Sequence, residues 1–178
     1  MATPDTLPLR PIERDDVSFL EEMSYLAAFA INGKIPDGTK SLEEVKNEPW
    51  FNENTQGWGR PGDHGFVAVD SDGNRIGAAW VRDYGDTEWY QEQSRTKPDM
   101  PTYQIVIAVK EGYRGQEVGT RLAEKTLGFA REAGIEVGLE VMPENNRVIE
   151  FYKKLGFTSM GNNGDYELMK IEPQTPVA

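Results

Sequence analysis

The sequence contains no cysteine and only one histidine, His64. Without cysteine the chain cannot form a disulfide, a thiol nucleophile or a thiolate zinc site. A single histidine argues against a Ser-His-Asp triad or a multi-histidine metal site, and we interpret His64, beside a strand-like segment, as structural or solvated. No run of about 18 apolar residues occurs, so no membrane-spanning helix is expected. These absences exclude thiol chemistry and disfavour triad and metal chemistry.

Positive charge is also scarce. The chain has 19 lysines and arginines against 30 aspartates and glutamates, for a net charge of −11. Because nucleic-acid phosphates require a basic surface, DNA and RNA are not expected as partners. An acidic protein attracts cations, which favours amines as substrates. The first residues have neither the basic start nor the apolar stretch of a secretory signal, and we expect a cytoplasmic protein.

The composition is that of an ordinary globular protein, with 38% hydrophobic and 28% charged residues in a chain of 178. This length suits one domain of 1–178, with a core at about 7–171 and short tails. No internal repeat or low-complexity segment is present. We therefore analyse the chain as a single folding unit.

The N-terminal third predicts a strand and two helices. Residues 7–12 contain two prolines and predict an edge strand, where proline is tolerated. Asp15 or Asp16 is expected to cap a helix. The apolar face of that helix comprises Val17, Leu20, Met23 or Ser24, and Ala27. Ser41 and Glu44 form a capping-box pattern at the start of a second, short helix.

The middle of the chain predicts a β-hairpin and a third strand. Residues 66–69 and 75–81 are strand-like, and the connection 70–74 is rich in the Asp, Asn and Gly that hairpin turns require. Residues 83–101 are polar and have no clear period, which predicts a long loop that is functional or mobile. Residues 103–109 form the clearest strand in the sequence.

The C-terminal part alternates helices and strands. A helix from about residue 118 has an apolar stripe and ends at Gly134. The stripe comprises Val118, Leu122, Thr126, Phe129 and Ala133. The later elements are a strand at 137–142, a helix at 146–155 and two short strands near 157–161 and 166–171. This order predicts an α/β sheet with a parallel pair in its middle.

Residues 113–120 join the clearest strand to the amphipathic helix. A helix N-terminus presents unpaired N–H groups and partial positive charge, which suits phosphate, and glycines allow close approach of the backbone. Arg114 can add a side-chain contact. The loop has neither the Gly-Lys-Ser/Thr ending of a Walker loop nor the Gly-x-Gly-x-x-Gly spacing of a dinucleotide site.

Two motifs resemble those of the GNAT superfamily of acyl-CoA-dependent N-acetyltransferases. The acyl-CoA loop of that family reads Arg/Gln-x-x-Gly-x-Gly/Ala, and here Arg114 and Gly119 match it whereas Glu117 stands at the middle glycine. The residues in register with the family's second motif are Asn145, Val148, Tyr152, Leu155, Gly156 and Phe157. The motifs occur in the right order, and the resemblance extends from about residue 9 to 171.

The resemblance implies a mixed, mostly antiparallel sheet of six to seven strands with a central splayed parallel pair, flanked by about four helices. It implies direct transfer of an acetyl group from acetyl-CoA to a primary amine of a small molecule or peptide, without a metal, and it allows a homodimer. The residues implied in acetyl-CoA binding are Ile107, Ala108, Val109, Arg114, Gly115, Gln116, Glu117, Val118, Gly119, Thr120, Asn145 and Tyr152.

Three chemical roles follow from the resemblance. A backbone N–H of Ala108 or Val109 would polarise the thioester carbonyl. Tyr152 matches the tyrosine that reprotonates the leaving thiolate. Glu140, in a Leu-Glu-Val strand, matches the base of relatives that resemble protein N-terminal acetyltransferases. An ordered water or a carboxylate of the 83–101 loop is the alternative base; the candidates are Asp83, Asp86, Glu88 and Asp99.

Two features bear on affinity and specificity. If position 117 is left-handed, a glutamate there costs on the order of 1–2 kcal/mol, and its charge beside a diphosphate costs about 1 kcal/mol in a solvated site. Trp89, Tyr90 and Tyr103 are candidate acceptor-binding residues, because aromatic walls suit cations; packing in the core or in a lid is the alternative role for the aromatics of this region. A non-catalytic acyl-CoA-binding module is the alternative function, favoured by Glu117 and by the absence of a carboxylate at the start of the 103–109 strand.

Overall fold

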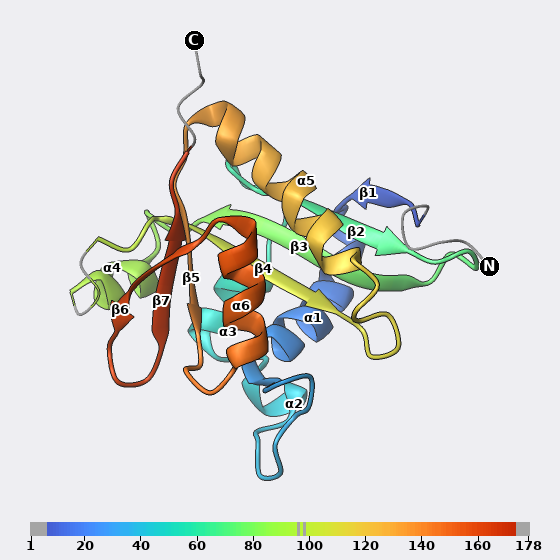
Figure 1. Ribbon diagram of the computed structural model, residues 1–178, viewed down its shortest axis with the longest axis horizontal. Helices are drawn as coiled ribbons and strands as arrows, with labels where there is room; N and C mark the ends of the chain where they lie inside the picture. Colours follow the sequence, from blue (N-terminus) through green and yellow to red (C-terminus); the bar gives the residue numbers. More distant parts are fainter. Residues whose placement is uncertain (1–6, 96, 98, 174–178) are drawn as a thin grey trace.

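The computed structural model describes residues 7–95, 97 and 99–173 and centres on one seven-stranded sheet (Figure 1). The strand order is β1-β2-β3-β4-β5-β7-β6. The strands are β1 (Leu9–Pro11), β2 (His64–Val69), β3 (Arg75–Asp83), β4 (Tyr103–Val109), β5 (Val137–Val141), β6 (Thr158–Asn162) and β7 (Glu167–Ile171). Every neighbouring pair is antiparallel except β4 and β5. The predicted fold class, with its parallel pair in the middle, is confirmed.

Helices cover both faces of the sheet. They are η2 (Arg14–Asp16, a 3₁₀ turn), α1 (Val17–Phe29), α2 (Leu42–Val45), α3 (Pro49–Thr55), α4 (Glu88–Ser94), α5 (Val118–Ala133) and α6 (Asn146–Leu155). Helix α1 packs with Val67 and Trp80, whereas α5 packs with Phe66 and Ala68. Alternate residues of β2 therefore face opposite layers. Figure 1 shows α1 and α5 on opposite sides of the sheet.

Local sequence signals account for several boundaries. The carboxylate of Asp70 accepts hydrogen bonds from the backbone N–H groups of Asp72 and Asn74, which closes the β2–β3 hairpin as predicted. Ser41 Oγ accepts from the Glu44 N–H at 3.3 Å, and Glu44 Oε2 accepts from the Ser41 N–H at 2.7 Å. The predicted capping box at α2 is thus confirmed.

The start of α1 is not capped as predicted. Asp16 occupies the N-cap position but makes no side-chain cap hydrogen bond to α1. Its buried carboxylate accepts two hydrogen bonds of 2.8 Å from Arg10 and lies 3.1 Å from Arg75. A paired, hydrogen-bonded charge can be buried, so Asp16 links β1 and β3 to the start of α1 rather than capping it.

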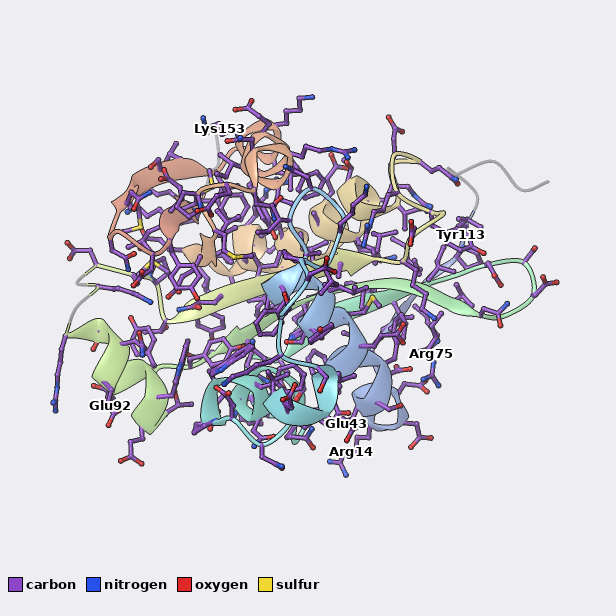
Figure 2. The ribbon with its side chains drawn as sticks, turned by 90° about the horizontal axis from the view of Figure 1, so that it is seen from below. Arg14, Glu43, Arg75, Glu92, Tyr113 and Lys153 are labelled. Carbon is purple, nitrogen blue, oxygen red and sulfur yellow. The ribbon has the colours of Figure 1, made fainter. Side chains whose placement is uncertain are left out.

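Sequence patterning missed two short helices, α3 and α4. Each has seven residues, which is too few to show a helical period. Helix α3 begins with Pro49, and α4 begins where Thr87 Oγ1 accepts the N–H of Tyr90. The segment 83–101, expected to be one long loop, therefore contains α4. Figure 2 shows charged side chains such as Glu43 and Glu92 on the outside of the short helices α2 and α4.

A buried arginine fixes α3 against the sheet. Arg82 of β3 has a fully buried side chain that pairs with Asp63 at 2.7 Å. Its Nη1 also donates to the carbonyls of Glu53 and Gln56 at the end of α3. These bonds satisfy the charge inside the protein and hold Asn54 of α3 against the sheet, where its carbonyl accepts from the Trp80 indole.

Strands β4 and β5 separate soon after they meet. Their parallel pairing comprises only Tyr103↔Val137 and Gln104↔Gly138. Beyond these pairs β4 stays bonded to β3 and β5 stays bonded to β7. A wedge therefore opens between the C-terminal halves of β4 and β5.

Within the described chain, no helix is both long and apolar enough to cross a membrane.

Candidate active site

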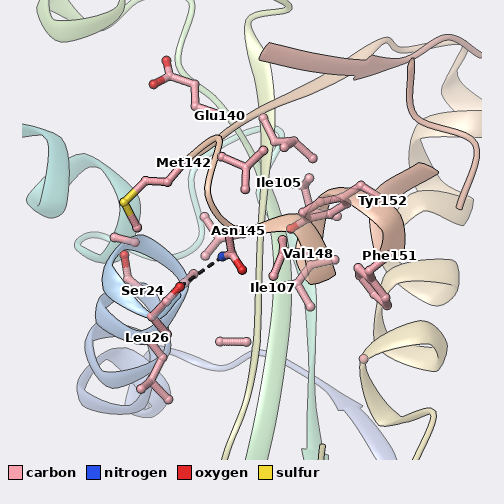
Figure 3. Close-up of a pocket in the computed structure, with 18 of the residues that line it drawn as sticks. Ser24, Leu26, Ile105, Ile107, Glu140, Met142, Asn145, Val148, Phe151 and Tyr152 are labelled. Carbon is pink, nitrogen blue, oxygen red and sulfur yellow. Dashed lines mark hydrogen bonds between the residues drawn. The ribbon is translucent and has the colours of Figure 1, made fainter. Parts of the chain in front are cut away.

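A cavity of about 720 Å³ occupies the wedge between β4 and β5. It is lined by residues 104–109 of β4, residues 139–142 of β5 and its exit, the C-terminal half of α1, the start of α5 and one face of α6. In Figure 3 Tyr152 lies next to Ile105 and Ile107, and Glu140 stands apart from them at the upper left. The cavity brings together both motifs noted in the sequence.

The β4 wall provides unpaired backbone groups. Ile107, Ala108 and Val109 all line the cavity, and none of them has a partner in β5, because pairing with that strand ends at Gln104. Alternate peptide groups of a strand point to alternate edges. This wall can therefore offer an N–H to an acyl carbonyl or to the amides of an extended ligand.

The loop before α5 has the conformation expected of an anion site. Gly112, Gly115 and Glu117 all have positive φ, and the first turn of α5 receives no side-chain cap from Glu117. The initial N–H groups of that helix are therefore left for a ligand or water. Gln116 and Val118 do not line the cavity: Gln116 Nε2 donates to the Gly112 carbonyl, and Val118 is buried in the core.

Glu117 adopts the left-handed conformation, with φ 61° and ψ 6°. Only glycine takes this conformation without cost, so the departure from the family motif carries backbone strain on the order of 1–2 kcal/mol. Its side chain is exposed and lines the cavity mouth. Because the carboxylate can point into solvent, the cradle remains open to a phosphate.

Gly119 allows close approach at the first turn of α5. A Cβ built there would lie 3.6 Å from atoms of Val109 and Phe151, an ordinary contact distance. The protein interior therefore does not demand glycine at this position. Thr120 follows on the same turn and also lines the cavity.

Arg114 is held by main-chain carbonyls. Its Nη1 donates to the Gly33 carbonyl at 2.6 Å and its Nε to the Val109 carbonyl at 3.0 Å. The guanidinium thereby joins the turn after α1 to the end of β4. Arginine has five N–H donors, so capacity remains for a phosphate oxygen.

Asn145 lines the cavity but uses its amide within the protein. Its Nδ2 donates to the Ala30 carbonyl at 3.0 Å, and its Oδ1 accepts from the Asn32 N–H at 3.1 Å. The residue is buried. Asn145 was expected to bind acetyl-CoA; in the structure its amide instead positions the turn after α1. Figure 3 shows the bond from its Nδ2.

Tyr152 is buried on α6, with its ring packed edge-on against Phe151 and Phe157. Among the described residues its hydroxyl has no hydrogen-bond partner, and in Figure 3 the hydroxyl end points into the cavity. Burial raises the pKa of the Tyr152 phenol above its usual value, because an apolar environment disfavours the phenolate. The group therefore stays protonated at neutral pH.

Glu140 of β5 lies at the other end of the cavity, and in Figure 3 its carboxylate points away from the Tyr152 ring. Its Oε1 is 2.6 Å from the Nζ of Lys97. That ammonium also lies 5.4 Å from the centre of the Tyr166 ring. The carboxylate is near the splay point but is paired with a lysine of the same chain.

Of the three aromatic residues predicted to bind the acceptor, one lines the cavity and two do not. Trp89 lines the cavity. Tyr90 and Tyr103 do not: the buried Tyr90 hydroxyl donates to the Met100 carbonyl, and Tyr103 packs beside Gly62. Tyr103 shares a sheet face with Ile105 and Ile107 but lies where β4 still pairs with β5, at Tyr103↔Val137, before the wedge opens. The alternative bases of the 83–101 loop, Asp83, Asp86, Glu88 and Asp99, also lie outside the cavity lining.

Sequence reasoning missed several polar side chains of the cavity, of which four matter here. They are Ser24, Tyr84, Lys97 and Tyr166. Ser24 is buried on α1, and its hydroxyl is the buried side-chain polar atom left without a partner in the described part of the chain. Ser24 had been assigned only to a helix face, and Lys97 and Tyr166 stand in polar segments without a motif. No sequence signal distinguishes these residues.

The comparisons with known proteins agree with the geometry. The model of the acetyltransferase (GNAT) family matches residues 30–157. The N-alpha-acetyltransferase RimI of Mycobacterium tuberculosis is 30% identical over 121 residues, which are 66% of this chain and 66%, just under two thirds, of that relative. The chain belongs to the acetyltransferase (GNAT) family.

Solved structures share the fold. The acetyltransferase yncA of Salmonella typhimurium, determined with acetyl-CoA, has a TM-score of 0.62 at 17% identity and covers 97% of both chains. The spermidine N-acetyltransferase of Vibrio cholerae, determined with CoA and spermine, has a TM-score of 0.59 at 17% identity, covering 95% of this chain and 96% of that one.

The site fits acetyl-CoA in its shape and its donors. The open first turn of α5 and the small Gly119 suit the pyrophosphate, and the splayed edge of β4 suits the pantetheine amides and the thioester. No group of three or more His, Cys, Asp or Glu side chains in the described ranges could hold a metal ion. His64 lies outside the cavity and stacks on Phe129 at 4.5 Å.

Proposed function

We propose that the chain is an N-acetyltransferase that moves an acetyl group from acetyl-CoA directly to a primary amine of a small molecule or peptide. The observation that carries the proposal is the meeting of three features in one cavity: the splayed edge of β4, the uncapped start of α5 and the inward hydroxyl of Tyr152. Membership of the acetyltransferase family supports it.

Each chemical role has a candidate group. The backbone N–H of Val109 donates a hydrogen bond to the carbonyl oxygen and stabilises its developing charge. The alternative donor, the Ala108 N–H, faces β3, because the Lys110 N–H two residues on donates to Ile76 of that neighbouring chain segment. Glu140 takes a proton from the acceptor's ammonium, directly or through a water, which produces the nucleophilic amine. Acetyl-CoA, when bound, supplies the thioester carbon that the amine attacks.

Tyr152 returns a proton to the leaving thiolate. Its burial keeps the phenol protonated, so it donates rather than accepts when the amine arrives. The hydroxyl lacks a competing partner among the described residues, which leaves its proton available. Glu140 and Tyr152 lie at different ends of the cavity, so proton removal and proton return occur at separate places.

The acceptor is proposed to be cationic. The chain carries a net charge of −11, and the acceptor end of the cavity combines Glu140 with the aromatic side chains of Trp89 and Tyr166. The names of the relatives include both an N-alpha-acetyltransferase and a spermidine N-acetyltransferase, so peptide α-amines and polyamines are the first classes to test.

We also expect a cytoplasmic location, where acetyl-CoA is available, and allow a homodimer.

The test is acetyl-CoA turnover, followed as free thiol, with a panel of polyamines, amino acids, aminoglycosides and peptides. The proposal predicts release that depends on one amine class and matches the amount of N-acetylated product detected by mass spectrometry. Acetyl-CoA binding without amine-dependent release on any acceptor would instead support the non-catalytic acyl-CoA-binding module, to which the strained Glu117 and the lysine-paired Glu140 point.

A further inference from the structure

Lys97 places an ammonium group inside the candidate active site. Its side chain is only 9% exposed, and its Nζ lies 2.6 Å from Glu140 Oε1. The face of Tyr166 lies 5.4 Å from the same nitrogen. Burying a lysine is unfavourable unless its charge is paired, so the carboxylate and the ring together form a built site for a primary alkylammonium.

The backbone around Lys97 holds it in this place. Its N–H donates to the Gln93 carbonyl at the end of α4, at 3.0 Å. Its own carbonyl accepts from the Met100 N–H, and the buried Tyr90 hydroxyl donates to the Met100 carbonyl. The backbone of Lys97 is therefore held by hydrogen bonds to Gln93 and Met100. Its side chain enters the cavity that contains Glu140.

The chemistry of this site is that of the acceptor amine. A lysine side chain ends in the same primary ammonium that the proposed reaction acetylates. The ammonium is bonded to the candidate base, and one continuous cavity is lined by Lys97, by Ile107 to Val109 of β4 and by Tyr152. Four flexible methylenes allow the nitrogen to leave Glu140 and move within this cavity.

We propose that Lys97 is an internal acetyl acceptor, which the chain acetylates itself when acetyl-CoA is present without an external amine. This inference rests on the proposed function. Glu140 removes a proton from the Lys97 ammonium, and the resulting amine forms an N–C bond to the acetyl carbonyl carbon. The carbon–sulfur bond breaks, Tyr152 protonates the thiolate, and the nitrogen loses its second proton to solvent. The products are acetyl-lysine and free CoA.

Acetylation also changes the site. Acetyl-lysine carries no charge and cannot form the ion pair with Glu140. The carboxylate becomes free to receive the ammonium of an external acceptor. Lys97 in its charged form therefore competes with that acceptor for Glu140, and the loss of its charge relieves the competition.

The experiment incubates the purified full chain with acetyl-CoA alone and measures acetyl-lysine by peptide mass spectrometry. The proposal predicts acetylation at Lys97 with a rate independent of protein concentration, because the reaction is intramolecular. Lys153, exposed on α6 and visible at the surface in Figure 2, reports non-enzymatic acetylation. Tyr152→Phe is expected to slow acetylation of Lys97 by about a hundredfold and to leave that of Lys153 unchanged.

A second measurement needs no acetyl-CoA. Calorimetric binding of butylammonium should tighten about tenfold in Lys97→Met, since the internal competitor is gone, whereas Lys153→Met should change nothing. Acetylation of external amines without any at Lys97 would overturn this inference and leave the proposed function intact. Acetylation of Lys97 that matches Lys153, or persists in Tyr152→Phe, would overturn it as well. Absence of both self-acetylation and amine turnover would contradict the proposed function itself.

Discussion

Asn145 and Asn32, 113 positions apart in the chain, are joined by a hydrogen bond of 3.1 Å from the Asn32 N–H to the Asn145 Oδ1. The other end of the Asn145 amide donates to the carbonyl of Ala30. Arg114 reaches the same turn through the Gly33 carbonyl. The turn after α1 is therefore held by one residue from each motif, and it forms a wall of the cavity shared by cofactor and acceptor.

Replacing Asn145 tests this bracing role. Asn145→Ala removes both hydrogen bonds, leaves buried partners unpaired and should lower the free energy of unfolding by about 2–4 kcal/mol. Asn145→Asp keeps the acceptor for the Asn32 N–H but sets a buried carboxylate oxygen against the Ala30 carbonyl oxygen, and it should cost at least as much. Denaturant unfolding gives the free energies, and hydrogen exchange at the Asn32 amide gives a local readout. Stability unchanged in both variants, with weaker acetyl-CoA binding, would show a ligand-binding role instead.

Two substitutions at Glu117 separate its charge from its backbone strain. Glu117→Gln removes the charge beside the expected diphosphate and should tighten acetyl-CoA binding about fivefold, which corresponds to about 1 kcal/mol. Glu117→Gly should tighten it similarly and also raise the free energy of unfolding by about 1 kcal/mol, because glycine accepts the left-handed φ. Calorimetry and denaturant unfolding measure the two effects. An unchanged or weaker affinity in Glu117→Gly would contradict this account of the loop.

Gly119→Ala tests the anion cradle. The added methyl meets Val109 and Phe151 at ordinary contact distances, so the fold should tolerate it, whereas the space for a pyrophosphate shrinks. We expect acetyl-CoA binding to weaken by about tenfold. Gly128→Ala on the same helix, with nothing within 4 Å, is the matched control and should leave binding unchanged. Equal affinities in the two variants would place the phosphates elsewhere.

Buried tyrosines predict a loss of stability at high pH. Burial raises the pKa of the Tyr84 and Tyr152 phenols above the usual value of about 10. Above that pH the unfolded chain releases these protons while the folded chain retains them, so the unfolded state binds fewer protons and stability falls as pH rises. Unfolding free energies measured from neutral pH to above pH 10 should decline, and the decline should be shallower in Tyr152→Phe. An identical slope would show that Tyr152 ionises freely in the folded protein.

Much of this architecture could be predicted from the sequence where local signals are strong. The capping box at Ser41, the Asp70 turn and the end of α6 at Gly156 follow from turn and cap chemistry that involves neighbouring residues. The parallel pair follows from the order of strands and helices. The left-handed backbone of Glu117 could be anticipated, because the family motif has glycine at that position.

The missed features depend on distant contacts. Asp15 or Asp16 was expected to cap α1, but Arg10 and Arg75, from two strands, bind the Asp16 carboxylate. Tyr103 is an aromatic residue of the kind that binds cations, yet it lies where β4 and β5 are still paired, before the wedge opens. Lys97, just after α4, becomes part of the site only because it meets Glu140 of β5, which is 43 positions away in the chain. No local pattern encodes that pairing.

The most direct test of the central claim is the rate of amine-dependent acetyl-CoA turnover in Tyr152→Phe, compared with Tyr25→Phe, which removes a hydroxyl outside the cavity lining. The account predicts a fall in kcat of about a hundredfold or more for Tyr152→Phe, and near-normal turnover for Tyr25→Phe. Equal turnover in the two variants and the parent chain would contradict the role of Tyr152 as the acid and the mechanism built on it.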